Sequence, residues 1–256
     1  MNNEVHAAAA ASARATAAVA KSPIGSLGGQ WMTQDAEEEL TAALGLDGWQ
    51  LYFLARHAPL GDVDPDVVAA AAYFFPPQYL RQEWTTARRS YTPGEVLAHY
   101  LRLCHDWGRA ALAGFPGADR LSELAQRVID GADVAGLPLF AGWRALDVPT
   151  GTGERLAHTM QVMREYHGAV HGVAVVGSGM TPLMAVLANQ GGAENAQAYG
   201  WQPPFPTVTD DDRRRRAQVE ELTDDLAAQA YETLGVDDRQ ELLDLLAQGH
   251  AHVFGS

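Results

Sequence analysis

Cysteine and long apolar segments are almost absent from this sequence, and each absence excludes a class of protein. The 256 residues contain one cysteine, Cys104, which rules out an internal disulfide framework and is typical of a reducing compartment. No run approaches the roughly 18 consecutive apolar residues of a membrane span. The alanine-rich start lacks the basic and strongly apolar regions of a secretory signal. We therefore expect a cytoplasmic protein without a membrane partner.

Positive charge is also scarce, because 18 Lys and Arg residues stand against 32 Asp and Glu residues and give a net charge of −14. Such a balance repels phosphate backbones unless the basic residues gather on one face. The run "DDDRRRR" at 210–216 looks like a basic patch, but the acidic residues around it offset its arginines and suit a solvated helix. Nucleic acid is therefore not among the partners that we expect.

Strand signals are nearly absent, whereas apolar residues recur with the 3.6-residue period of helices almost throughout. Helix starts are marked by Asp64 before a proline and by a capping box that begins at Thr92. Stretches rich in Gly and Pro mark the breaks. These patterns predict an all-α fold, a multi-helix globule of about eleven helices. They also predict an N-terminal helical domain (1–150) and a C-terminal helical domain (151–256), packed intimately.

The segment "REYHGAVHG" places His167 and His171 four residues apart, so both imidazoles lie on one face of a helix. That face also carries Met163, so the histidines belong to an apolar stripe. Three interpretations stay open: two core histidines, acid/base groups that titrate near neutral pH beside a carboxylate, or two ligands of a metal. A metal needs a third ligand that the sequence does not nominate. Glu165 precedes both histidines, so the HExxH pattern, in which the glutamate lies between them, is absent.

Arg56 and His57 end an aromatic helix that contains Tyr52, just before a sharp turn at "APLG". Arg56 either points into a cavity as a clamp for a carboxylate or caps the C-terminal carbonyls of its own helix. Cys104 and His105 are adjacent on a helix and therefore face different directions, which disfavours a catalytic Cys–His pair. We expect Cys104 in the core.

Three segments resemble, in order and spacing, an actinobacterial family known as helix-turn-helix proteins, over residues from about 40 to 250. The stretch "YFLARHAPLG" is similar to the family's Y-F-x-x-R-x-A-P-L-G, "REYHGAVHG" is similar to REHRGDGH, and "VEELTDDLAAQAYETLG" is similar to IE-x-x-T-D-x-L-A. The matching residues are Arg56, Pro59, Leu60, Gly61, Arg164, Glu165, Gly168, His171, Glu220, Thr223 and Asp224. The resemblance implies a C-terminal half similar to MarR-type winged-helix domains.

The sequence departs from this family pattern where DNA reading would need it. His167 stands where the pattern has an arginine, and Ala169 stands where it has an aspartate. The segment in place of the recognition helix and wing has no strand pair, and no Lys or Arg occurs between Arg164 and Arg213. A winged helix needs basic side chains on both parts. We therefore expect the wing to be lost and the winged-helix-like C-terminal half to be degenerate.

These observations favour a small-molecule-binding pocket protein, in its catalytic form an enzyme of actinobacterial specialised metabolism. The alternative is a ligand-responsive winged-helix-type transcriptional regulator that binds DNA as a dimer. The expected catalytic acid/base residues are His171, His167 and Glu165. The expected substrate-binding residues, with the arginines as an anion clamp, are Arg56, Arg164, His57, Tyr52 and Met163. We expect a small-molecule ligand or substrate and no cofactor; a metal, if bound, would be held by His167 and His171. A homodimer is compatible with the sequence.

Overall fold

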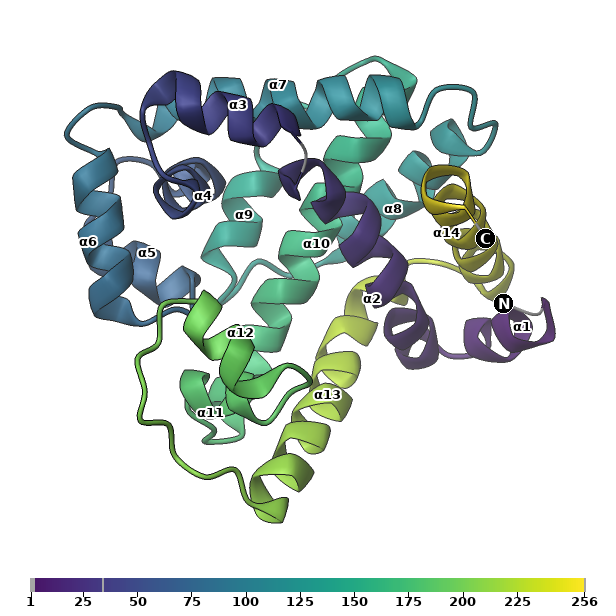
Figure 1. Ribbon diagram of the computed structural model, residues 1–256. Coiled ribbons are helices and arrows are strands. Elements are labelled where there is room, and N and C mark those ends of the chain that lie inside the picture. Colours follow the sequence, from purple (N-terminus) through teal and green to yellow (C-terminus); the bar gives the residue numbers. More distant parts are fainter. Residues whose placement is uncertain (1–2, 34, 256) are drawn as a thin grey trace.

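The computed structural model describes residues 3–33 and 35–255, and helices account for its regular structure (Figure 1). No strand occurs among these residues, so the predicted all-α fold is confirmed. The α-helices are α1 (Asn3–Ala10), α2 (Ala13–Gly29), α3 (Asp35–Leu44), α4 (Gly48–Arg56), α5 (Pro65–Ala71), α6 (Pro77–Ala87), α7 (Pro93–Ala111), α8 (Ala118–Gly131), α9 (Pro138–Arg144), α10 (Thr152–Gly177), α11 (Pro182–Leu187), α12 (Gly192–Ala198), α13 (Asp210–Tyr231) and α14 (Val236–Phe254). Two short 3₁₀-helices, η1 (Gln30–Thr33) and η2 (Ala58–Leu60), follow α2 and α4. Within the described ranges, no helix is both long and apolar enough to cross a membrane.

Helix α10 runs through the centre of the molecule (Figure 1). It packs against α2, α7, α8, α9 and α13, which come from both ends of the chain. Its 26 residues carry buried side chains on nearly every turn, as expected of a helix that other helices cover on several sides. Residues that are distant in the sequence are therefore brought together along this one axis.

Two helices cross α10 at glycines that let the backbones approach closely. A Cβ atom at Gly108 of α7 would lie 2.5 Å from the carbonyl oxygen of Gly153 on α10. A Cβ atom at Gly28 of α2 would lie 2.5 Å from the carbonyl oxygen of Met160. Because no real Cβ atom tolerates such distances, only glycine allows these two crossings.

The helices begin at the capping residues that the sequence indicates. The side chain of Asp64 accepts a backbone N–H bond at the start of α5, as predicted. Thr92 and Glu95 form both halves of the predicted capping box on α7, and Thr209 and Asp212 form another on α13. These bonds satisfy amide groups that would otherwise have no partner in the first turn of each helix.

The structure has more helices than the about eleven predicted, because short helices occupy segments whose Gly and Pro content marks them as breaks. Helices α9 and α11 begin at Pro138 and Pro182, where the missing amide hydrogen costs no helical hydrogen bond. Helix α12 follows Gly191, which has the left-handed φ of 84°. Proline and glycine therefore start short helices here as well as ending long ones.

One hydrophobic cluster fills most of the molecule and contains residues from both sides of position 150. Its fully buried large side chains include Trp31, Trp84, Trp143 and Tyr231. Cys104 is also fully buried in this cluster as a free thiol, so its predicted core position is confirmed. The division of the chain into domains at residue 150 stays a prediction.

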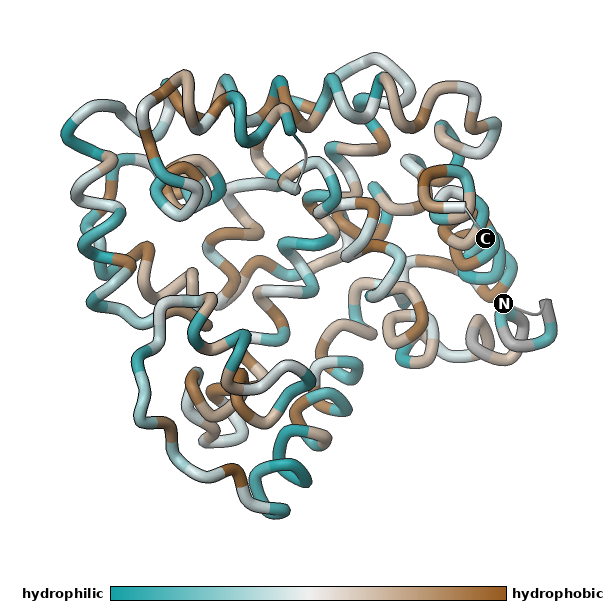
Figure 2. The backbone as a smooth tube through the Cα atoms, in the orientation of Figure 1, coloured by the Kyte–Doolittle hydropathy of each residue, from teal (hydrophilic) through white to brown (hydrophobic). Residues whose placement is uncertain are grey.

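The first turns of α13 are hydrophilic (Figure 2). Arg213 donates to Asp210 and Arg214 donates to Asp211, over 3.0 and 2.7 Å, and all four side chains are exposed. Acidic neighbours therefore offset these arginines on a solvated helix, as the sequence predicts.

Candidate functional site

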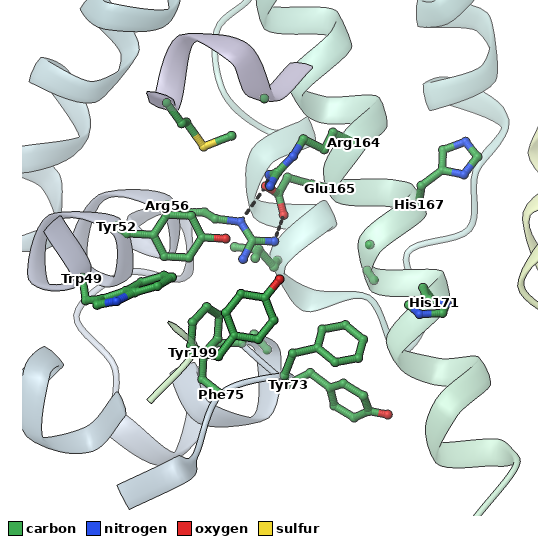
Figure 3. Close-up of a pocket in the computed structure, with 18 of the residues that line it drawn as sticks. Trp49, Tyr52, Arg56, Tyr73, Phe75, Arg164, Glu165, His167, His171 and Tyr199 are labelled. Atoms are coloured by element: carbon green, nitrogen blue, oxygen red, sulfur yellow. Dashed lines mark hydrogen bonds and ion pairs between the residues drawn. The ribbon is translucent and has the colours of Figure 1, made fainter. Parts of the chain in front are cut away.

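A cavity of about 880 Å³ lies between α4, the C-terminal part of α2, the turn after α5, and the helices α10 and α13 (Figure 3). Its volume falls in the range of sites for small organic ligands. Aromatic side chains form much of its wall: Trp49, Tyr52, Tyr73, Phe74, Phe75, Tyr79 and Tyr199. The cavity is therefore a candidate site for a ligand with an aromatic or apolar body.

The aromatic wall is assembled from three separate segments of the chain. Trp49 of α4 stacks on Phe53 one turn later, with ring centroids 5.7 Å apart, and its edge contacts Phe75 after α5 at 5.0 Å. Tyr199, which follows α12, lies 5.1 Å from the ring of Phe75. Aromatic contacts of this kind add to the free energy gained by burial and hold the rings in defined orientations.

Two hydrogen bonds fix the turn after α5 against its neighbours. The hydroxyl of Tyr73 donates to the carbonyl oxygen of Gly172 on α10 over 2.6 Å. The indole N–H of Trp201 donates to the carbonyl oxygen of Phe74 over 2.9 Å. The segment after α12 is thereby joined to the turn that carries the aromatic residues.

The main charged feature of the cavity is a pair of arginines that share one glutamate. Arg56 at the end of α4 donates from Nε and Nη2 to the two carboxylate oxygens of Glu165 on α10, over 2.8 and 2.7 Å. Arg164 donates to Oε1 of the same carboxylate over 3.1 Å, and the amide of Gln161 donates to it over 2.8 Å. Both guanidinium groups point to this carboxylate in Figure 3. Two positive charges face one negative charge, so Arg56, Arg164 and Glu165 together carry a net charge of one positive unit, while Glu37 and Asp47 also line the cavity.

The Glu165 carboxylate is 1 % exposed and the Arg56 side chain is 13 % exposed. Burial alone would raise the pKa of Glu165, but the adjacent charge and hydrogen bonds of Arg56 outweigh burial and lower that pKa. Burial would likewise lower the pKa of Arg56, and the charge of Glu165 raises it instead. Both groups are therefore ionised at neutral pH. The Arg56 guanidinium also lies 5.3 Å from the ring centroid of Tyr52, in cation–π geometry.

His171 lies toward the other end of the cavity. Its Nδ1 is 2.9 Å from the hydroxyl oxygen of Thr223 on α13, and its ring stacks on Phe74 with centroids 5.6 Å apart. Burial, helped by the charge of Arg216, lowers the pKa of His171 to about 4. The imidazole is therefore neutral at pH 7.

His167 also borders the cavity, but its hydrogen bond joins it to the core. Its Nε2 lies 2.8 Å from the hydroxyl of Tyr231, and in Figure 3 the ring points away from the labelled aromatic side chains. Burial, followed by the charge of Lys21, lowers the pKa of His167 to about 4. The expectation that these imidazoles titrate near neutral pH is wrong for both, because burial lowers both pKa values and, at His171, outweighs the attraction of Glu220.

A balanced set of charges surrounds His171. Lys21 of α2 donates to Glu220 and Asp224 of α13 over 2.8 and 3.1 Å, and Arg216 forms an ion pair with Glu220 at 2.6 Å. Burial raises the pKa of Glu220, but its hydrogen bonds to Lys21 and Arg216 lower it to about 2. Two positive and two negative groups thus cancel at this end, in contrast to the end that holds Arg56.

The described residues contain no group of three or more His, Cys, Asp or Glu side chains placed to hold a metal ion. His167 and His171 each have a hydrogen bond to a hydroxyl group instead, on Tyr231 and Thr223. The third ligand that a metal site needs is therefore missing beside this pair within the described ranges.

The structure brings most of the expected site residues to one cavity. Its lining includes Tyr52, Arg56, Arg164, Glu165, His167 and His171. Of the two proposed orientations of Arg56, the one toward the cavity is present, since its side chain donates to both carboxylate oxygens of Glu165. His57 and Met163 lie outside this lining and are fully buried. His57 donates from Nδ1 to the carbonyl oxygen of Phe53 over 3.0 Å, and burial lowers its pKa to about 3.

Several lining residues were not among those expected from the sequence. They are Lys21, Trp49, Tyr73, Phe74, Phe75, Tyr79 and Tyr199. The segment "AYFFPPQY" could have indicated part of a binding site, because four aromatic residues lie around a proline turn. Nothing in the sequence near Lys21 or Tyr199 indicated a site. Lys21 reaches the cavity through the packing of α2 on α10 and α13, and Tyr199 through its contacts with Trp49 and Phe75.

The chain belongs to the helix-turn-helix family, whose profile matches residues 14–256. This membership agrees with the resemblance carried by the three sequence segments. No curated protein and no solved structure shows a significant match.

Proposed function

We propose that this protein binds a small molecule with an aromatic or apolar body and a single anionic group such as a carboxylate. The observation that carries the proposal is the sharing of Glu165 by Arg56 and Arg164 at one end of an aromatic cavity. Glu165 neutralises one guanidinium group, so one positive charge is left for a ligand anion. Aromatic side chains supply contact area for the rest of the ligand.

Arg164 is the group assigned to the ligand anion. Both Nε and Nη2 of Arg56 donate to Glu165. Arg164, in contrast, has one hydrogen bond of 3.1 Å to that carboxylate, and its side chain is 27 % exposed. A ligand carboxylate is therefore placed to accept further hydrogen bonds from the guanidinium group of Arg164. Glu165 positions Arg164, and Arg56 offsets the charge of Glu165, so the charge of Arg164 is not cancelled.

The catalytic form of the proposal, an enzyme of specialised metabolism, assigns acid/base chemistry to His171. At neutral pH, a neutral imidazole with a pKa of about 4 has one hydrogen-bond donor and one acceptor and can act as a weak base, but it is not a general acid. Ligand binding needs only the geometry already described, and it is the function we put forward.

Thermal melting with matched ligand pairs tests this function. Naphthalene-2-carboxylate and biphenyl-4-carboxylate are expected to raise the Tm in a concentration-dependent way, because a ligand that binds only the folded state stabilises it by mass action. The corresponding carboxamides have the same aromatic body without the charge and are expected to give much smaller shifts. Equal shifts from acids and amides, or no shift from any of the four, would contradict the proposal.

Membership of the helix-turn-helix family is compatible with a second candidate, a ligand-responsive transcriptional regulator. For its C-terminal half, the sequence resemblance implies a MarR-like domain. This candidate requires salt-sensitive binding to duplex DNA. Arg213 and Arg214 are paired with aspartates, and no Lys or Arg occurs from 165 to 212. We therefore expect no sub-micromolar gel shift with random duplex DNA at low salt, and such a shift would favour the regulator.

A further inference from the structure

Thr223 determines which nitrogen of His171 carries the proton. The Thr223 hydroxyl oxygen lies 2.7 Å from the carbonyl oxygen of Val219, and two oxygens this close need a proton between them. The hydroxyl therefore donates to Val219 and can only accept from His171 Nδ1, at 2.9 Å. The proton of the neutral imidazole is thus on Nδ1, and Nε2 is a bare acceptor.

His171, which carries this acceptor, lines the same cavity as Arg164. No side chain or backbone group within the described ranges forms a hydrogen bond to Nε2 of His171. The stack on Phe74, with an angle of 28° between the rings, fixes the plane of the imidazole. Because the charges of Lys21, Arg216, Glu220 and Asp224 around it balance, this end suits a neutral donor better than a second charged group.

Helix α10 sets the spacing between the two ends of the cavity. Arg164, Gly168 and His171 are separated by four and three residues and therefore share one face. From Arg164 to His171 the helix rises by about 10 Å, at 1.5 Å per residue. A Cβ atom at Gly168, midway between them, would meet no atom within 4 Å, so the floor between the two polar groups is open.

We infer that the ligand carries a hydroxyl group at the end opposite its carboxylate, and that this hydroxyl donates to Nε2 of His171. The ligand class is thus a phenolic aromatic acid whose two polar ends are about two helical turns apart. This inference rests on the proposed function, since it takes the carboxylate at Arg164 as the other anchor. Thr223 acts through His171 as a positioning residue, because it holds the imidazole in the accepting tautomer.

Three probes that differ only in the 4′ substituent test binding at the hydroxyl end of the ligand separately from binding at its carboxylate end. They are 4′-hydroxybiphenyl-4-carboxylate, its 4′-methoxy analogue and unsubstituted biphenyl-4-carboxylate. Calorimetry on the wild-type protein is expected to give a Kd for the hydroxyl probe about tenfold lower than for the methoxy probe, the effect of one good hydrogen bond. The methoxy oxygen can only accept, so it cannot pair with a bare Nε2.

Substitutions at His171 and Thr223 test the tautomer. His171→Phe keeps a ring against Phe74 and removes the acceptor, so the hydroxyl and methoxy probes are expected to bind this variant with about equal affinity. Thr223→Val removes the acceptor for Nδ1–H, which lets the other tautomer present an N–H to the cavity. The methoxy probe should then gain affinity and the preference should shrink, whereas Thr223→Ser should retain the wild-type preference. A merely structural role for Thr223 would weaken all three probes alike and leave their ratio unchanged.

The outcomes separate this inference from the proposed function. If all three probes bind through Arg164 with equal affinity, or if the preference survives in both His171→Phe and Thr223→Val, the hydroxyl assignment is overturned while carboxylate binding stands. If none of the three probes binds the wild-type protein, both proposals are overturned. A preference that is lost in His171→Phe and Thr223→Val and retained in Thr223→Ser supports the inference.

Discussion

The bidentate ion pair between Arg56 and Glu165 joins α4 to α10 across 109 residues of sequence, at the wall of an aromatic cavity. A buried carboxylate of this kind is stable in its charged form only because a guanidinium group compensates for lost hydration. The pair thus fixes the orientation of α4, and it leaves the charge of Arg164 available in the cavity.

Glu165→Gln is expected to destabilise the protein strongly, because it leaves two guanidinium groups facing no carboxylate. Removal of one partner from a buried ion pair costs about 3–5 kcal/mol. The free energy of unfolding from urea titration measures the effect. Arg213→Gln, which breaks an exposed pair on α13, serves as the matched control and is expected to change little. Similar losses of unfolding free energy from the two substitutions would show that the buried ion pair contributes no more to stability than the exposed one.

Gly168 offers a way to fill the cavity without disturbing the packing of α10. Gly168→Ala is expected to raise the free energy of unfolding by about 0.5–1 kcal/mol, because alanine favours a helix interior and its Cβ meets open space. Gly168→Leu should fold with a similar Tm and lose the Tm shift from biphenyl-4-carboxylate, because its side chain occupies the ligand position. Full ligand binding by the leucine variant would place the ligand elsewhere.

Buried neutral histidines are expected to make the protein less stable as the pH falls from 6.5 to 5. The pKa of His57 is lowered to about 3, so between pH 6.5 and 5 the unfolded chain takes up a proton that the folded chain refuses. The stability from this group is complete above pH 6.5 and is lost as the pH falls, by about 1.4 kcal/mol per pH unit for a fully buried histidine. His167 and His171 act in the same direction, since both pKa values are lowered to about 4.

The slope of unfolding free energy against pH measures this effect, and His57→Asn isolates the contribution of His57. Asparagine keeps an N–H for the carbonyl of Phe53 and does not titrate, so the slope should become shallower by the contribution of one histidine. Gln78→Asn changes an exposed side chain that does not titrate and should leave the slope as in the wild type. An unchanged slope in His57→Asn would mean that His57 is protonated in the folded protein.

The sequence was sufficient for the all-α fold and for the starts of helices such as α5 and α7. Capping residues such as Asp64 and Thr92 act within one helical turn, so their effect is readable from neighbouring residues alone. The pairing of Arg56 with Glu165 was not readable in the same way. Both residues were expected in one site, but whether an arginine meets a ligand or a glutamate depends on how α4 packs on α10.

The histidines illustrate a second limit of the sequence. Their spacing placed His167 and His171 on one face, but burial and hydrogen-bond partners decide what an imidazole does. Tyr231 and Thr223 come from α13, more than fifty residues away, and they give the two rings different environments. Burial also lowers both pKa values, which no pattern within α10 could indicate.

The most direct test of the central claim is a calorimetric comparison of biphenyl-4-carboxylate with its carboxamide on the wild-type protein and on Arg164→Gln. In the variant, Glu165 still pairs with Arg56, and this remaining pair carries no net charge. Binding of the carboxylate to the wild-type protein at least about tenfold tighter than the amide, which corresponds to about 1.4 kcal/mol, and loss of that preference in Arg164→Gln are the results we predict. Equal affinity of acid and amide for the wild-type protein, or an undiminished preference in Arg164→Gln, would contradict the account.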